Sequence, residues 1–321
     1  MTSAAPARLD GSQFRHGAVF YRGLEEFTGV VAPFIREGLA AREPVLVAEL
    51  PDRIDALEAE LGPDATAVSF LDMAELGANP ARIIPAWRGF VEQHAGSAVR
   101  GVGEPVWAGR SSAELDECRL HESLLNVAFD DLVSDFRLLC PYDAGALPGA
   151  VLADAQRTHP VVGAARQRAT YGATYGATYG GHAHALGEFR RALPGPAGVL
   201  EQMEFGAEDL AGLRSVVHRL CELVRLPGEV VEDLVLATHE LASNSVVHGG
   251  GRGLLRGWRE GQALVLEVSD PGVIADPLVG REQPAPLSEG GRGVWMANQL
   301  CDLVQVRSGA DGTSVRVYTW L

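Results

Sequence analysis

The feature that most constrains this chain is a repeat near its middle. Residues 169–180 read ATYG three times in succession. A four-residue period fits neither the two-residue alternation of a strand nor a helix with Gly in every fourth position. An LPGP run follows a few residues later. We therefore predict a flexible linker over residues 161–196, with one domain at 10–160 and another at 197–321.

Composition limits the partners and the chemistry of both halves. The chain has 321 residues, 46% of them hydrophobic, so each half can bury a core. Its net charge of −15 is spread over both halves, which argues against binding to nucleic acid. All 27 basic residues are Arg, which excludes mechanisms that need a Lys, such as that of a P-loop.

Several patterns are typical of a cytoplasmic protein. The four Cys are widely spaced and form no CxxC pair, which indicates reduced thiols. The first residues lack the charged and then apolar pattern of a signal peptide. No apolar run reaches the ~18 residues that span a bilayer. We expect a cytoplasmic location and no membrane partner.

Strand-like and helix-like segments alternate in the first half. Short apolar strands are expected at 18–22, 45–50, 67–71, 98–102 and 136–140. Helices are expected at 24–42, 52–61, 81–94 and 113–131. This alternation predicts an α/β domain with a mostly parallel sheet and helices on both of its faces.

The second half has a different order of elements. A strand at 199–205 precedes two helices at 208–225 and 229–247, and hairpin-like pairs of strands follow at 254–269 and 303–320. A long loop, roughly 272–291, and a short helix at 294–301 separate the pairs. The order predicts an α+β two-layer sandwich, with helices on one face of a largely antiparallel sheet. A loop of that length is usually functional.

A polar helix face is the first candidate site of this second domain. Glu240, Asn244 and His248 follow one another at four-residue spacing, so they share one face of the helix. A carboxylate and an amide oxygen on one turn can position a water and a Mg²⁺ ion. Taken alone, such a pattern is more often a solvated helix face.

Three further motifs follow in order. Asp270-Pro271-Gly272 ends an apolar strand, and its carboxylate can accept a hydrogen bond from an exocyclic amine. Gly290-Gly291-Arg292-Gly293 precedes a helix, whose free N–H groups suit phosphate oxygens. Gly312-Thr313 opens the last strand, where the hydroxyl can bond the same carboxylate or a water. Each alone also reads as ordinary turn or loop chemistry.

Together, the four motifs resemble those of the GHKL superfamily, also called the Bergerat fold, and within it the anti-sigma-factor serine/threonine kinase branch. The resemblance implies bound ATP and Mg²⁺, with Asn244 as the Mg²⁺ ligand and Glu240 as the general base. It implies that Asp270 reads adenine with support from Thr313. Gly291, Arg292 and Gly293 would face the phosphates, and His248 and Gly272 complete the expected ATP-binding set.

Phrases in the first half resemble the MEDS sensory domain, a bacterial input module similar to RecA/KaiC-like ATPases. They include the segment around His16 and the strand end Gly103-Glu104-Pro105-Val106-Trp107. Ligands of open α/β sheets bind at the carboxyl ends of strands. We therefore expect a pocket for an unknown small ligand, formed by His16, Glu104, Trp107, Glu122 and Tyr142; a purely structural role for these residues is the alternative.

Two sets of residues also have a metal-ligating composition. Cys118 and His121 lie one helix turn apart and could join Cys140, although buried free thiols are commoner. His182 and His184 follow the repeat, but exposed His beside Gly usually bind nothing.

We expect a signalling regulator in which the sensory domain controls a protein serine/threonine kinase acting on an anti-sigma antagonist. The alternative is an ATP-dependent module that sequesters a sigma factor or another regulator without catalysis. A histidine kinase is less favoured, because neither His159 before Pro160 nor the His pair after the repeat lies in a sequence that supports two long helices. The signal, the partner and a possible homodimer are left open.

Overall fold

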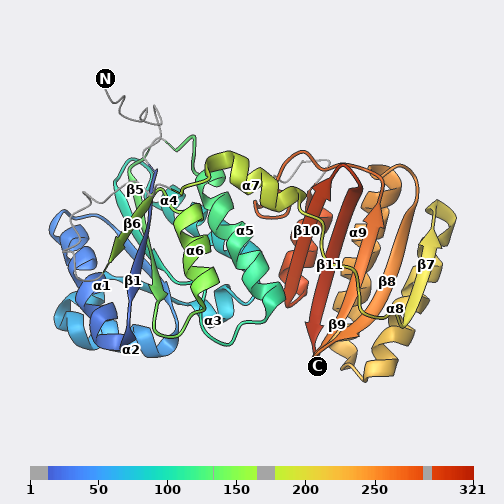
Figure 1. Ribbon diagram of the computed structural model, residues 1–321, viewed down its shortest axis with the longest axis horizontal. Helices are drawn as coiled ribbons and strands as arrows, with labels where there is room; N and C mark the ends of the chain where they lie inside the picture. Colours follow the sequence, from blue (N-terminus) through green and yellow to red (C-terminus); the bar gives the residue numbers. More distant parts are fainter. Residues whose placement is uncertain (1–13, 133, 165–177, 285–290) are drawn as a thin grey trace. The chain divides into compact units, whose positions relative to one another are not determined.

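The computed structural model describes residues 14–132, 134–164, 178–284 and 291–321. The chain forms two compact units, residues 1–75 with 86–184 and residues 76–85 with 185–321. Each unit has its own β-sheet (Figure 1). No helix in the described part of the chain is long and apolar enough to cross a membrane.

The N-terminal sheet has six strands, and all of its described pairings are parallel. In sheet order, the strands are β3 (Ser69–Asp72), β2 (Val45–Glu49), β4 (Val99–Gly103), β5 (Phe136–Asp143), β1 (Phe14–Tyr21) and β6 (Val161–Ala164). The predicted parallel α/β fold is confirmed.

Helices cover both faces of this sheet. They are α1 (Gly23–Ala40), α2 (Pro51–Leu61), α3 (Met73–Leu76), α4 (Ile83–Gln93), α5 (Ser112–Ala128) and α6 (Gly149–Thr158). Neighbouring residues of β4 show the two faces: the Arg100 side chain packs against Gly38 of α1, whereas Gly101 faces Trp87 of α4. Successive strand residues point to opposite faces, so α1 and α4 lie on opposite sides.

The segment predicted to be a linker contains regular structure at both ends. Residues 161–164 form β6, which pairs with β1 through Gly17 and Val161. Residues 181–190 form α7 (Gly181–Arg190), which buries Ala185 and Phe189. The local sequence does not predict either element, because β6 is stabilised by pairing with β1 and α7 by burial of its apolar residues. Most of the repeat falls at 165–177, outside the described residues.

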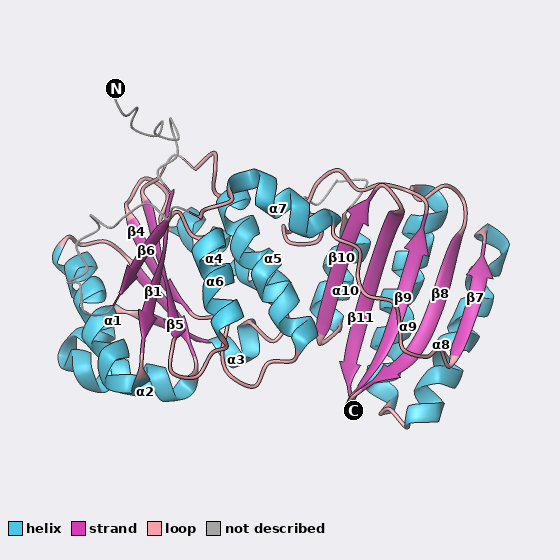
Figure 2. Cartoon of the chain, in the orientation of Figure 1, coloured by secondary structure: helices cyan, strands magenta, loops and turns pink. Residues whose placement is uncertain are grey.

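The C-terminal sheet has five strands, paired antiparallel throughout. In sheet order, they are β10 (Leu303–Gly309), β11 (Gly312–Trp320), β9 (Ala263–Asp270), β8 (Gly253–Glu260) and β7 (Glu201–Phe205). Figure 2 shows the helices of this unit on one face of the sheet. They are α8 (Leu210–Val224), α9 (Gly228–Val247) and α10 (Arg292–Leu300). The predicted two-layer sandwich is confirmed.

Close packing between the two layers fixes α9 over the centre of this sheet. Leu234 and Leu241 of α9 and Leu266 of β9 are each at most 3% exposed. Gly257 of β8 lies against Leu220 of α8, where an added Cβ would lie 2.3 Å from a leucine methyl carbon. The inner face of α9 is thus buried, and its polar residues lie along the edge of this contact.

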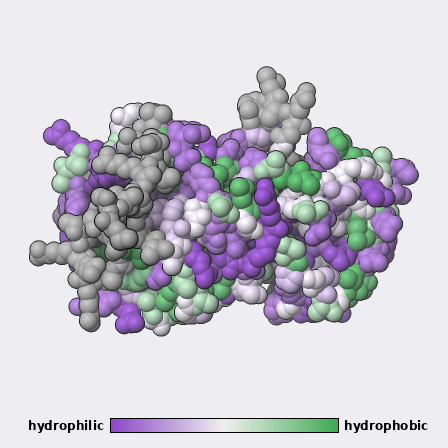
Figure 3. Space-filling view, turned by 45° about the horizontal axis from the view of Figure 1, so that its top comes forward, coloured by the Kyte–Doolittle hydropathy of each residue, from purple (hydrophilic) through white to green (hydrophobic). Residues whose placement is uncertain are grey.

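The outer surface carries scattered apolar side chains. Leu223, Val247 and Val273 are among the large hydrophobic residues that are well exposed. On the face in view in Figure 3, hydrophilic and hydrophobic residues are interspersed. Single exposed apolar residues of this kind are normal for folded proteins.

Candidate nucleotide site

Helix α9 brings the first set of predicted site residues together. Glu240 and Asn244 are half-buried, and His248 follows as the residue that ends the helix. The His248 backbone N–H donates to the Asn244 carbonyl at 2.7 Å, so the helical spacing continues to this point. Asn244 and His248 both line a cavity of about 180 Å³.

Asp270, the last residue of β9, lies at the wall of the same cavity and is fixed on both oxygens. Its Oδ2 accepts a hydrogen bond from Ser245 Oγ at 2.6 Å, and its Oδ1 accepts one from the Gly272 N–H at 2.8 Å. A Cβ on Gly249 would lie 2.4 Å from the carboxylate carbon, so only glycine allows this approach. Each oxygen retains a lone pair for a further donor.

Thr313 supports this site through the backbone, not through the carboxylate. Its hydroxyl donates to the Gly272 carbonyl at 2.9 Å, so the predicted bond to Asp270 is not the one that forms. Ser308 Oγ lies 2.8 Å from Thr313 Oγ1 and accepts the Ile274 N–H at 2.7 Å. Since the Thr313 proton is already used, Ser308 donates to Thr313. These hydrogen bonds fix the backbone at Gly272 and Ile274.

The start of α10 packs against the polar face of α9. A Cβ on Gly293 would lie 2.5 Å from Asn244 Nδ2 and 3.4 Å from Glu240 Cβ. Gly291 precedes the helix with φ +83°, a conformation that side chains disfavour. Arg292 is the first helical residue and is exposed. Residue Gly290 lies outside the described part. The glycine motif and the helix motif therefore meet in space.

The cavity has the chemistry of a purine site. Its wall is largely apolar, with Leu241, Val268, Val294 and Val315 among its lining residues, and the Asp270 carboxylate lies among them. A flat heteroaromatic ring with an exocyclic amine fits such a wall and such an acceptor. The residues present therefore fit the adenine end of ATP, and Asn244 can supply an oxygen to a hydrated Mg²⁺.

The five residues predicted to form one sensory pocket in the N-terminal unit fall into separate groups in the structure. His16 and Glu122 do meet: the His16 Nε2 to Glu122 Oε2 distance is 3.2 Å. Cys140 and His159 join them, and the Tyr142 ring stacks edge-on against His159. Burial, followed by the charge of His159, lowers the pKa of His16 to about 4. Glu122 and Tyr142 also line a cavity of about 210 Å³.

Glu104 belongs to a different cluster at the carboxyl ends of β1, β2 and β4. It accepts hydrogen bonds from the Tyr21 hydroxyl at 2.9 and 3.1 Å, and its Oε2 lies 3.3 Å from Arg53 Nε. Burial raises the pKa of Glu104 to about 8, although Arg53 and Tyr21 oppose this shift. Burial and then Glu104 raise the pKa of Glu49 well above its usual range.

The other predicted residues of the N-terminal unit have separate partners. Trp107 is half-buried, and the Arg110 guanidinium carbon lies 3.5 Å from the centre of its ring. Cys118 donates its S–H to the Pro105 carbonyl at 3.2 Å, so it does not join Cys140 as a metal ligand. Of the three residues considered as metal ligands, Cys118, His121 and Cys140, only Cys140 belongs to the metal-ligating group among the described residues, with His16, Glu122 and His159.

Sequence reasoning missed residues whose roles depend on folding. Ser245 bonds Asp270, and Ser308 bonds Thr313 and the Ile274 N–H. Glu49, Tyr21 and Arg53 surround Glu104. Ser245 had a detectable signal, because it directly follows Asn244 inside the helix motif. Ser308 had no such signal, since it belongs to none of the four motifs and reaches Thr313 only through the hairpin pairing of β10 with β11.

Comparison with family models identifies the two units. Residues 15–160 match the model described as MEDS, the methanogen/methylotroph DcmR sensory domain. Residues 203–319 match the model of the histidine kinase-like ATPase domain. The chain therefore contains a MEDS domain followed by a histidine kinase-like ATPase domain, and the second domain implies ATP binding.

The remaining comparisons are distant. A solved structure of the RsbU and RsbW domains of Rv1364c from Mycobacterium tuberculosis is 17% identical, with a TM-score of 0.29. The match covers 38% of this chain and 32% of that one. The curated proteins give no match.

Proposed function

We propose that this protein is a cytoplasmic signalling regulator whose MEDS domain controls an ATP-dependent protein serine/threonine kinase of the anti-sigma type. The observation that carries the proposal is the position of Glu240, one turn before Asn244 on α9, with its Cβ against Gly293 at the start of α10. A binding module has no need of a carboxylate there. The protein substrate would be an antagonist of an anti-sigma factor, and transcription would be the regulated process.

Each residue has a role in this proposal. Asp270 accepts the adenine amine, and Asn244 holds Mg²⁺, which neutralises phosphate charge when bound. The backbone N–H groups in the first turn of α10 would donate hydrogen bonds to the phosphates. Glu240 takes the proton of a substrate hydroxyl as its oxygen attacks the γ-phosphorus and the bond to ADP breaks. Phosphoryl transfer depends mostly on positioning and charge, so one base is sufficient.

The alternative is a clamp, meaning a binding module that, when ATP is bound to it, sequesters a sigma factor or another regulator and transfers no phosphate. A histidine kinase has less support. His159 is fully buried, and His182 and His184 lie on the ten-residue α7. In the described part of residues 159–200, α7 is the longest helix, and a dimerising hairpin needs two long ones.

The test separates transfer from binding. A partner is captured from the native lysate with and without Mg·ATP, and phosphate incorporation into it is measured. Glu240→Gln keeps the side-chain size but cannot take a proton, so it should retain ATP binding and lower transfer ~10²–10⁴-fold. Asn244→Ala should weaken ATP binding itself. Glu229→Gln, at the exposed start of α9, is the matched control and should change neither.

Two outcomes contradict the proposal. If the wild type and Glu240→Gln bind the partner equally and neither phosphorylates it, the clamp is the correct account. If Glu240→Gln abolishes ATP binding, the division of roles along α9 is wrong.

A further inference from the structure

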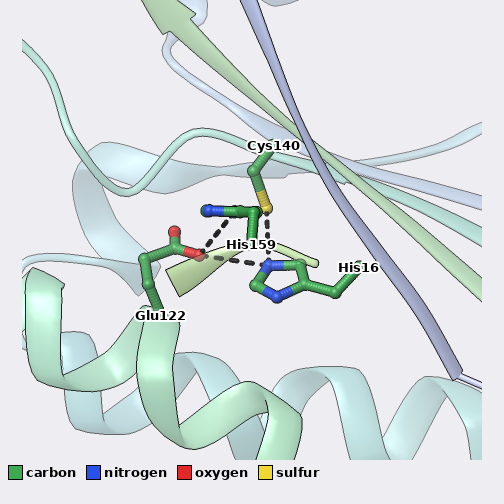
Figure 4. A group of neighbouring side chains, drawn as sticks. All are labelled: His16, Glu122, Cys140 and His159. Carbon is green, nitrogen blue, oxygen red and sulfur yellow. Dashed lines mark hydrogen bonds and ion pairs between the residues drawn. The ribbon is translucent and has the colours of Figure 1, made fainter. Parts of the chain in front are cut away.

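Four side chains from distant parts of the chain converge inside the MEDS domain. Figure 4 shows His16 on β1, Glu122 on α5, Cys140 on β5 and His159 just before β6. All four are at most 1% exposed. Their nearest ligand atoms all lie within 4.8 Å of one another, and no other described residues form a metal-ligating group of three or more.

Hydrogen bonds fix which nitrogen of each imidazole faces the cluster. Asn126 Nδ2 donates to the Thr158 carbonyl at 2.8 Å, so the Asn126 Oδ1 atom is the one that meets His16 Nδ1, at 3.2 Å. His159 Nδ1 lies 2.8 Å from the Ala155 carbonyl. Both Nδ1 atoms are therefore the N–H donors, and both Nε2 atoms direct a lone pair inward. This outer bonding is typical of metal-bound histidines.

Without a metal, the Cys140 thiol can donate its S–H to His16 Nε2. The other inward atoms are lone-pair donors, and Cys140 becomes one when a metal displaces its proton. His16 Nε2 and His159 Nε2 each lie 3.2 Å from Glu122 Oε2, and His16 Nε2 lies 3.3 Å from Cys140 Sγ. Within the described residues, both Glu122 oxygens and His159 Nε2 have no hydrogen-bond partner of good geometry. Lone pairs that face one another at this distance in a buried site repel unless a cation lies between them.

Three of the separations approach those of a tetrahedral metal centre, and all of them lie within 4.8 Å, so the side chains would have to move closer together around an ion. Bonds of about 2.0–2.3 Å to N, O and S place adjacent ligand atoms about 3.3–3.6 Å apart. The separations from Glu122 Oε2 to the two Nε2 atoms and from His16 Nε2 to Cys140 Sγ, at 3.2–3.3 Å, are close to that range. One thiolate and one carboxylate also cancel the charge of a divalent ion, so the buried site would be neutral.

We propose that His16, Glu122, Cys140 and His159 form a binding site for one Zn²⁺ ion in the MEDS domain. Imidazole and thiolate together favour zinc over Mg²⁺ or Ca²⁺, which prefer oxygen ligands. Glu122 also lines the cavity of about 210 Å³, so the ion lies at the wall of the space open to a small ligand.

The experiment uses the full chain, stripped of metal and then titrated with Zn²⁺ against a chromophoric chelator in excess Mg²⁺. The wild type should bind one Zn²⁺ per chain. Its Co²⁺ form should show thiolate-to-cobalt charge transfer and the d–d bands of a tetrahedral ion. Cys140→Ala should lose the charge-transfer band and bind Zn²⁺ at least ~100-fold more weakly.

Matched variants separate this site from other ligands. Cys118→Ala removes a second buried thiol of the same domain and should keep both the band and the affinity. The pair His182→Gln and His184→Gln should also leave them unchanged. Asn126→Ala should weaken Zn²⁺ binding ~10–100-fold, because Asn126 positions the His16 ring. Glu122→Gln should weaken it without removing the charge-transfer band.

Folding is followed in parallel by circular dichroism. Each variant should match the stripped wild type, and Zn²⁺ should raise the unfolding temperature of the wild type but not of Cys140→Ala. Either of two results overturns the proposal: a wild type that takes up no Zn²⁺, or a Co²⁺ spectrum that Cys140→Ala leaves unchanged. In the first case the cluster is an imidazolium–carboxylate ion pair.

Discussion

At the residue scale, Asp270 shows how folding fixes the orientation of a hydrogen-bonding carboxylate. The Ser245 hydroxyl and the Gly272 N–H each bind one of its oxygens, and Gly249 leaves the space for it. The side chain therefore has one orientation before any nucleotide arrives. A group held in this way binds with a smaller loss of conformational entropy.

We expect Asp270→Asn to weaken Mg·ATP binding by ~10–100-fold, the effect of a lost charge-assisted hydrogen bond of about 1–3 kcal/mol. The amide can still pair with Ser245 and the Gly272 N–H, so the fold should be kept. Calorimetry of the full chain measures the change. Asp311→Asn, in the exposed turn before β11, is the control and should bind as the wild type does. Equal affinity of wild type and Asp270→Asn would refute the adenine assignment.

At the scale of elements, the nucleotide site depends on how closely α10 approaches α9. The two helices meet at Gly293, opposite the Asn244 amide. Any larger residue must displace either the amide or the helix. The glycine therefore has a packing role in addition to any role beside phosphates.

Gly293→Ala should weaken Mg·ATP binding at least ~10-fold, because its Cβ would meet Asn244 Nδ2 at 2.5 Å. Gly228→Ala is the control: this first residue of α9 has open space around its Cα, so affinity should not change. Fluorescence titration with a labelled ATP analogue compares them. Unaltered binding by Gly293→Ala would show that Asn244 can move without loss.

The ends of β2 and β4 carry a second, pH-dependent feature. Glu49 and Glu104 are buried together with Arg53, and burial raises the pKa of both carboxyls, that of Glu104 to about 8. Such a carboxyl keeps a proton in the folded state that the unfolded chain has released. The free energy of unfolding therefore falls as pH rises from about 5 to about 8.

Glu49→Gln should stabilise the N-terminal unit by at least ~1 kcal/mol at pH 8 and change little at pH 5, because the amide resembles the protonated carboxyl. Glu104 can then ionise beside Arg53. Hydrogen exchange of β2 and β4 amides in the full chain measures the effect. Glu58→Gln, on the exposed side of α2, serves as the control. A pH-independent difference would show that the two carboxyls do not share this titration.

At the scale of the whole molecule, charge decides what kind of partner can be bound. The net charge is −15, and all the cations are Arg. Phosphate backbones bind through clustered cations that release counterions, and an acidic protein lacks this driving force.

We therefore expect no binding to duplex DNA at physiological salt, with or without Mg·ATP. Fluorescence anisotropy of a labelled duplex at micromolar protein measures this directly, and a basic DNA-binding domain is the positive control. A dissociation constant below ~1 µM for the duplex would contradict the expectation.

The sequence by itself determined both fold classes. Alternation of apolar runs predicts the parallel sheet, and the order of strands and helices predicts the sandwich, because hydrophobic periodicity is a local property. Helical spacing put Glu240 and Asn244 on one face of a helix, because this spacing is also a local property. Asp270 joined the expected site only through the resemblance of the four ordered motifs to the Bergerat fold.

Only the tertiary structure decided which polar residues of the MEDS domain meet. His16, Glu122 and Cys140 come from three separate elements and His159 from the connection between α6 and β6, and the parallel crossovers bring them together. Glu104, expected with His16, lies instead beside Arg53 and Tyr21. The local sequence did not predict the pairing of β6 with β1 either. Contacts between distant segments depend on strand order and register, which no local pattern encodes.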